Sequence, residues 1–491
     1  MAGLPRRPRP WRRGVLLGPL LAVTVAGVLA GPPVTSAASG PATTPDTSTA
    51  SFSTPPATGT VNEPLNVAVE GLPAGYVEHE FFASGTATAY EATSMPANGR
   101  WTVTPTTTAP YETRVIVRRP KTRAAFNGTV VLEWTNQSSG ESVPDWAYLN
   151  PAISRAGVAY VAVTAQALAV NGGTSLLGSP VTGLRDIDPD RYGSLEHPGD
   201  QYAYDIVDQV GRALRQGTDA GVLGGLQPKR VVVVGESQSA FFLTTYANTL
   251  QAQNGTFDGV FVHSRSGSAA SLDGLALPGG TDGSAVRVRS DLDVPVFVFE
   301  TETDLLMLGY AAARQPNTSR LRTWEVAGTS HADSYIVGKY AGILGCDSIN
   351  DGPQHLVAQA AFTAFLTWVQ GGPAPSTPAR LKIRTGATPT FVLDQVGNVR
   401  GGVRTPAVDA PTSILSGIGP TGASTTCRLF GSSKHLGARQ LVRLYGTEPA
   451  FLSAVRASLG RAVGDGYVLR PDRGGILRDA RTVASWVPQW R

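Results

Sequence analysis

Apolar runs and helix-like repeats alternate along the middle of this chain. The runs are typical of strands buried on both faces of a parallel sheet, and they occur at residues 129–134, 158–164, 230–234, 259–263, 294–299 and 322–326. Apolar residues recur with helical spacing around 204–214, after residue 237 and over 355–369. Strands separated by helices predict an α/β fold, in which a mostly parallel central sheet carries helices on both faces.

Weaker patterns flank this alternating region. Further strand signals precede it at residues 76–82, 101–103 and 113–118. A Gly- and Pro-rich stretch begins at residue 371 and marks its end. We therefore expect a core over residues 61–372 and a C-terminal extension over 373–491 that packs on it, with a helix near 448–463. The pattern leaves open whether the extension is a separate domain or a cover over the site.

The first residues have the composition of an export signal. Five Arg and no acidic residue precede an apolar run over 15–30, and small residues follow it up to Ala38. This order predicts a signal peptide over residues 1–38 and a secreted, extracellular protein. A pair of adjacent arginines leaves a twin-arginine export route open. Residues 39–60, rich in Ala, Ser, Thr and Pro, predict a flexible lead-in.

Removal of the signal changes the charge balance. The whole chain has 41 Lys and Arg against 37 Asp and Glu, and the mature chain would have 36 against 37. A near-neutral protein gives no reason to expect nucleic acid as a partner. No segment after the signal is long and apolar enough to predict an integral membrane span.

The sequence contains no recognisable metal or cofactor motif. Asp186, Asp188 and Asp190 alternate as in a calcium loop, but the Gly and the final Glu of that motif are absent. No His or Cys cluster has zinc spacing, and nucleotide-binding motifs are missing. We expect neither metal nor cofactor, and a small-molecule substrate.

The chain has two cysteines, Cys346 and Cys427. An even number in an exported protein predicts a disulfide, which would tie the C-terminal extension to the core. Two free buried thiols are the alternative.

Residues 230–240 read Arg-Val-Val-Val-Val-Gly-Glu-Ser-Gln-Ser-Ala. A buried strand is followed by a sharp turn and then a helix, so Gly235-x-Ser237-x-Ser239 approximates the Gly-x-Ser-x-Gly nucleophile elbow. Ser239 stands where the motif has Gly. This context predicts that Ser237 is a nucleophile.

A serine nucleophile needs a base, and the base needs an acid. Of six His, His331 follows the strand 322–326 by a short loop, which places it at the carboxyl edge of the sheet beside Ser237. The strand 294–299 leads into a loop with several carboxylates, of which Asp304 is the expected acid and Glu302 the alternative.

Acyl transfer also needs donors for the oxyanion that forms. The elbow supplies the backbone N–H of Gln238. The loop after residues 129–134 should supply the second donor, from Asn136 or Gln137.

Several stretches of the chain resemble the α/β-hydrolase superfamily, and more narrowly the bacterial proteins known as "alpha/beta hydrolase domain-containing". The matching stretches lie between about residue 60 and about residue 480, at 132–136, 188–193, 197–205, 235–240, 262–265, 301–304, 325–333 and 397–406. The resemblance implies the α/β-hydrolase fold and serine hydrolase chemistry at Ser237, His331 and Asp304 or Glu302. It implies no particular substrate.

Taken together, these patterns favour a secreted serine hydrolase that cleaves carboxylic esters through an acyl-enzyme on Ser237. A serine peptidase, an acyltransferase and a non-catalytic binding protein are the alternatives. Large apolar residues near the elbow favour neutral esters: Trp134, Trp146, Phe241, Phe242 and residues 305–308. Phe241 and Phe242 could equally serve to pack their helix onto the sheet.

Overall fold

The computed structural model describes residues 47–64, 71–217, 221–274, 285–340, 342, 344–488 and 490. All of them belong to one compact unit that begins at Thr43. The predicted signal peptide, residues 1–38, and the start of the predicted lead-in lie outside the described residues.

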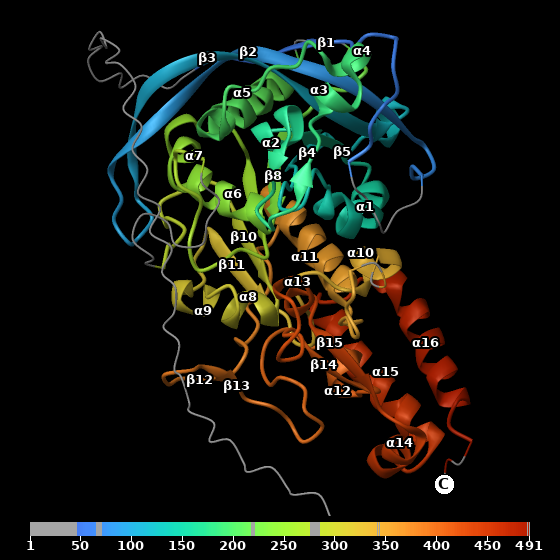
Figure 1. The fold of residues 1–491 in the computed structure, drawn as a ribbon. Coiled ribbons are helices and arrows are strands. Elements are labelled where there is room, and N and C mark those ends of the chain that lie inside the picture. The colour runs from blue at the N-terminus through green and yellow to red at the C-terminus, as the bar shows by residue number, and fades with distance from the viewer. Residues whose placement is uncertain are drawn as a thin grey trace, which may run out of the picture. The chain divides into compact units, whose positions relative to one another are not determined.

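A nine-stranded sheet forms the centre of the fold, in the order β1-β2-β3-β5-β4-β8-β9-β10-β11 (Figure 1). The six strands from β5 to β11 in this order are parallel, whereas β1, β2 and β3 pair antiparallel at one edge. The strands are β1 Ser51–Ser53, β2 Tyr76–Ser94, β3 Thr102–Pro120, β4 Thr129–Trp134, β5 Ala159–Val163, β8 Arg230–Glu236, β9 Gly259–His263, β10 Val296–Glu300 and β11 Leu321–Glu325. The predicted parallel α/β sheet is confirmed.

Helices cover both faces of the sheet because neighbouring strand residues point to opposite sides. Val231 and Val233 pack with helices α5 (Ala203–Gln216) and α6 (Gln238–Asn248). Val232 and Val234 pack with α1 (Pro144–Ala156) and α11 (Gln354–Val369). All four valines are buried, which explains the uninterrupted apolar run in the sequence.

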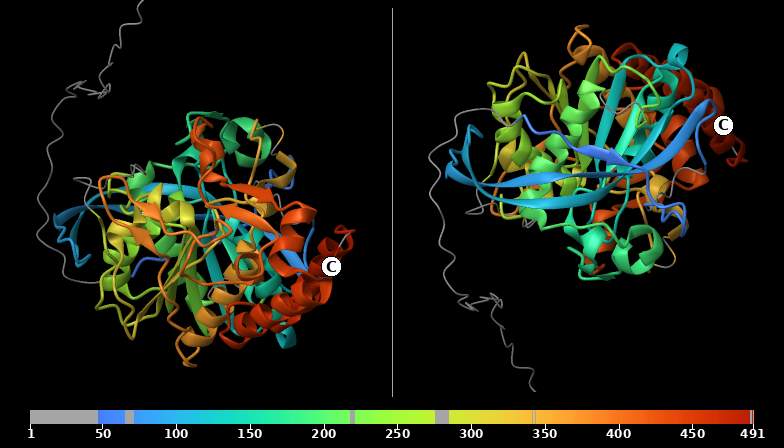
Figure 2. Two further views of the ribbon diagram at one scale, coloured as in Figure 1. Left: turned by 90° about the horizontal axis from the view of Figure 1, so that it is seen from below. Right: turned by 90° about the horizontal axis from the view of Figure 1, so that it is seen from above.

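The edge of the sheet differs from the sequence prediction. Strands β2 and β3 form one long antiparallel hairpin of 19 residues each, where the sequence predicted only short strands (Figure 2). The prediction of a flexible lead-in over 39–60 is wrong for residues 50–53, because β1 pairs with β2 and Ala50 packs into the core.

The C-terminal extension packs on the loops that follow β10 and β11. Its strands β14 (Ser413–Ser416) and β15 (Ser432–His435) pair with each other, and Cys427 is joined to Cys346 by a disulfide, as the even cysteine count predicted. The elements labelled from β12 to α16 in Figure 1 show this part of the chain. Its helices are α12 Pro406–Asp409, α13 Thr425–Leu429, α14 Ala438–Tyr445, α15 Glu448–Gly464 and α16 Arg473–Ser485.

Shorter elements complete the described chain. The helices are α2 Ala167–Asn171, α3 Leu184–Ile187, α4 Pro189–Tyr192, α7 Leu250–Asn254, α8 Glu302–Leu306, α9 Tyr310–Ala313 and α10 Ser334–Val337. The remaining strands are β6 Gly173–Thr174, β7 Pro180–Val181, β12 Ile383–Arg384 and β13 Thr390–Phe391. Within the described ranges, no helix has both the length and the apolarity needed to cross a bilayer.

Candidate active site

Ser237 occupies a strained turn between β8 and α6. Its backbone has φ 58° and ψ −120°, and in the described part of the chain only Ser264 shares a positive φ among non-glycine residues. The Ser237 N–H donates to the His263 carbonyl at 3.0 Å. This is the geometry of a nucleophile elbow, which lifts the serine hydroxyl above the sheet edge.

The residues around the turn explain its sequence. A Cβ atom at Gly235 would lie 3.1 Å from the side chain of Ser239 and 3.2 Å from its backbone, so the close return of α6 favours glycine there. Ser239 replaces the usual second glycine, and its hydroxyl donates to the Thr135 carbonyl at 3.0 Å. The departure from the motif is therefore accommodated by a buried hydrogen bond.

The structure brings together the three side chains that the sequence proposed. The Nε2 atom of His331 lies 2.7 Å from the Ser237 hydroxyl oxygen, and its Nδ1 atom lies 2.7 Å from Oδ1 of Asp304. With its proton on Nδ1, the ring donates to Asp304 and accepts from the serine hydroxyl. Burial lowers the pKa of His331, but the carboxylates of Asp304 and Glu236 outweigh it and hold the pKa above its ordinary value.

Asp304 is fixed by its own helix. It lies in the first turn of α8, where its Oδ2 accepts from the backbone N–H and from the hydroxyl of Thr301, both at 2.7 Å. This reciprocal cap leaves Oδ1 for His331.

Glu302, the alternative acid, is turned toward the C-terminal extension. Its carboxylate accepts from the backbone N–H groups of Gly328 at 2.6 Å and Gly417 at 2.8 Å. Burial raises its pKa to about 7. These contacts hold the loop before His331 against the extension. Glu302 therefore links two loops and does not contact His331.

The two predicted oxyanion donors differ in their environment. Gln238 is the first residue of α6, so its backbone N–H has no partner within the helix. Every N–H of Asn136 is engaged: its backbone donates to Ser142 at 2.9 Å, and its side chain donates to the carbonyl and the carboxylate of Glu236 at 3.0 and 3.3 Å. The Gln137 N–H donates to the Gln238 side chain at 2.9 Å. Asn136 thus fixes the elbow, and no donor on it is free for an oxyanion.

The sequence prediction missed one carboxylate of the site. Glu236, inside the elbow motif, places Oε1 at 3.7 Å from Nε2 of His331. Behind the elbow, Nδ1 of His263 lies 2.8 Å from Asp145. Burial lowers the pKa of His263 to about 4, so this ring is neutral. The only sequence signal was the position of Glu236 beside the nucleophile.

The expected apolar pocket is not formed by the residues proposed for it. Trp134 and Phe242 are buried against each other in the core, with ring centres 5.3 Å apart. Trp146 packs on Tyr160 at 4.6 Å, on the opposite face of the sheet. The prediction of a pocket role is therefore wrong for these three residues, because their size serves core packing. Leu306, Met307 and Leu308 remain partly exposed.

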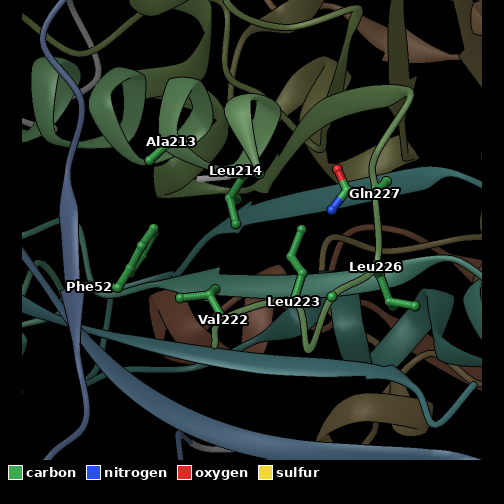
Figure 3. A pocket seen from close by; sticks show the side chains of 9 residues that line it. Phe52, Ala213, Leu214, Val222, Leu223, Leu226 and Gln227 are labelled. Atoms are coloured by element: carbon green, nitrogen blue, oxygen red, sulfur yellow. The ribbon is translucent and has the colours of Figure 1, made fainter. Parts of the chain in front are cut away.

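A small apolar pocket lies elsewhere, between the end of α5 and the loop before β8 (Figure 3). Its lining includes no nucleophile and no titratable group: Phe52, Ala213, Leu214, Gly217, Val222, Leu223, Gly225, Leu226 and Gln227. The pocket therefore offers no chemistry. Among described residues, no cluster of three or more His, Cys, Asp or Glu could hold a metal ion.

Comparisons with known proteins identify the family. Among curated proteins none matches the sequence. Solved structures to which the chain is similar include esterase Est22, at 14% identity and a TM-score of 0.33, covering 61% of this chain and 82% of that one. Another is dienelactone hydrolase from Anabaena variabilis ATCC 29413, at 13% identity and a TM-score of 0.30, covering 57% and 98%. The model of the alpha/beta hydrolase domain family matches residues 38–478. The chain therefore belongs to the alpha/beta hydrolase domain family.

Proposed function

We propose that this protein is a serine hydrolase that cleaves carboxylic esters through an acyl-enzyme on Ser237. The observation that supports the proposal most strongly is the continuous hydrogen-bonded series from Ser237 through His331 to Asp304. The same three residue types, in the same chain order, form the triad of α/β hydrolases.

The geometry suggests how each group would act. As the Ser237 oxygen attacks the ester carbonyl, its proton passes to Nε2 of His331. Asp304 keeps the ring oriented and stabilises its positive charge. The free N–H of Gln238 points out of the helix start and would bind the oxyanion. His331 then protonates the leaving alcohol, and water hydrolyses the acyl-enzyme by the same route.

The charges around the site favour an uncharged substrate. The groups that act electrostatically on His331 are the carboxylates of Asp304 and Glu236, and His263 behind them is neutral. Carboxylates beside the reacting serine disfavour an anionic ester. We therefore propose neutral esters as the substrate class. We also propose that the protein acts outside the cell, since the first 38 residues resemble an export signal and disulfides persist in oxidising compartments.

A panel of neutral esters, carboxylate-bearing esters and unmodified peptides tests this proposal. We expect hydrolysis of the neutral esters, little of the anionic ones and none of the peptides. Ser237→Ala should remove the ester activity while the thermal unfolding curve shows a folded protein. Efficient peptide cleavage, or unchanged ester turnover by Ser237→Ala, would overturn the proposal.

A further inference from the structure

A second carboxylate faces the proposed base from the side of the nucleophile. Glu236 is the last residue of β8 and is only 5% exposed. Its Oε1 lies 3.7 Å from the same Nε2 atom of His331 that contacts the Ser237 hydroxyl at 2.7 Å. The Asn136 amide holds both the carbonyl and the carboxylate of Glu236. The carboxylate is thus fixed close to where positive charge would form.

We infer that Glu236 is a positioning residue that stabilises the His331 imidazolium during acyl transfer, an inference that rests on the proposed function. When the bond from the Ser237 oxygen to the ester carbon forms, the hydroxyl proton moves to Nε2 of His331. The ring, now positive, lies between Asp304 at Nδ1 and Glu236 near Nε2. As the bond to the leaving alkoxide breaks, that proton passes to the alkoxide oxygen. Glu236 takes no proton in this sequence.

The surrounding groups determine when Glu236 is charged. His331 is faced by Asp304 from α8, by Glu236 from β8 and by the neutral His263 from β9. Asp145 of α1 and Glu300 of β10 lie one step further out, beside His263 and Asp304. Burial raises the pKa of Glu236 to about 7, although the two histidines oppose the shift. Glu236 therefore gains its charge as the pH rises through neutrality, and its charge in turn helps to hold the pKa of His331 above its ordinary value.

The pH dependence of kcat/KM for Glu236→Gln tests the inference, with a neutral p-nitrophenyl ester as substrate. Glutamine keeps the size of the side chain and its contact with Asn136 but removes the charge. We expect the acid limb to move to lower pH by about one unit, since a carboxylate within a few ångströms raises a histidine pKa by roughly that amount. The value of kcat/KM on the plateau above this limb should fall about tenfold, because a lower pKa of His331 makes it a weaker base.

Glu302→Gln is the matched control. Its carboxylate is also buried and also has a pKa near 7, but it binds Gly328 and Gly417. We expect its acid limb to stay at the wild-type position. Glu236→Asp, which keeps the charge and moves it back by one methylene, should give a limb between those of wild type and Glu236→Gln.

The outcomes separate the inference from the proposed function. An active Glu236→Gln enzyme with an unmoved acid limb would overturn the inference and leave the function standing. If Glu236→Gln fails to fold, the pH profile of Glu236→Asp provides the test. An acid limb at the wild-type position in that variant would also contradict the positioning role of Glu236. A wild-type protein that neither hydrolyses the ester nor reacts with a fluorophosphonate would remove the function itself.

Discussion

The roles of neighbouring residues at this site differ because each side chain has different hydrogen-bond partners. Asp304 and Glu302 are two residues apart on the same short helix, yet Asp304 binds His331 while Glu302 binds two backbone N–H groups. In the proposed mechanism the first arrangement orients a base, whereas the second holds two loops together. Both carboxylates are similarly buried. Their roles therefore differ because the two side chains point toward different partners.

Replacing Asp304 with Asn should lower kcat by on the order of 10⁴, because an amide cannot hold His331 in the tautomer that accepts the serine proton. Steady-state kinetics on a neutral ester measures the loss. Glu302→Gln, measured beside it, should retain far more activity, since it leaves the His331 contact intact. The opposite ranking of the two variants would transfer the role of the acid to Glu302.

At the level of elements, strand ends explain how much of the site could be predicted. Ser237, Asp304 and His331 each follow an apolar run, and parallel strands bring such positions to one edge. The engagement of Asn136 could not be predicted, since its partner Glu236 is 100 residues away in the chain. The full length of the hairpin β2–β3 was not predicted, because the end of β2 and the start of β3 are rich in Thr and partly exposed. Apolar and polar residues do not alternate clearly there.

The elbow itself should be sensitive to one methyl group. Gly235→Ala would place a Cβ 3.1 Å from Ser239, so the start of α6 and the Ser237 hydroxyl must shift. We expect kcat/KM to fall by about 10²-fold, as for other small misplacements of a reacting group. Gly460→Ala, in the exposed middle of α15 with nothing near its Cβ, should leave activity unchanged. It should raise stability by roughly 0.4 to 1 kcal/mol. Equal kinetics for the two variants would contradict this reading of the elbow.

Across the whole molecule, the C-terminal extension contacts the loops that carry Asp304 and His331. Glu302 binds Gly417, and Thr303 donates to the Gly417 carbonyl while accepting from the His331 N–H at 2.9 Å. The sequence predicted an extension that packs on the core, but the composition change near residue 371 could not show that Gly417 would contact the loops beside His331. The loops that carry Asp304 and His331 are therefore held partly by residues more than 80 positions further along the chain.

The disulfide should stabilise this arrangement. It closes a loop of 81 residues between Cys346 and Cys427, for which the chain-entropy relation gives roughly 4 to 5 kcal/mol. The double variant Cys346→Ser, Cys427→Ser should unfold at clearly lower urea concentration, and reduction of the wild type should have the same effect. Coincident unfolding curves for the oxidised, reduced and variant proteins would show that the cross-link contributes nothing.

Ser237 is proposed to form the covalent intermediate, and fluorophosphonate labelling followed by mass spectrometry tests this role most directly. We predict one adduct per wild-type chain, located on the peptide that contains Ser237, and none on a folded Ser237→Ala variant. Stoichiometric labelling of that variant, or an adduct on another residue of the wild type, would contradict the account.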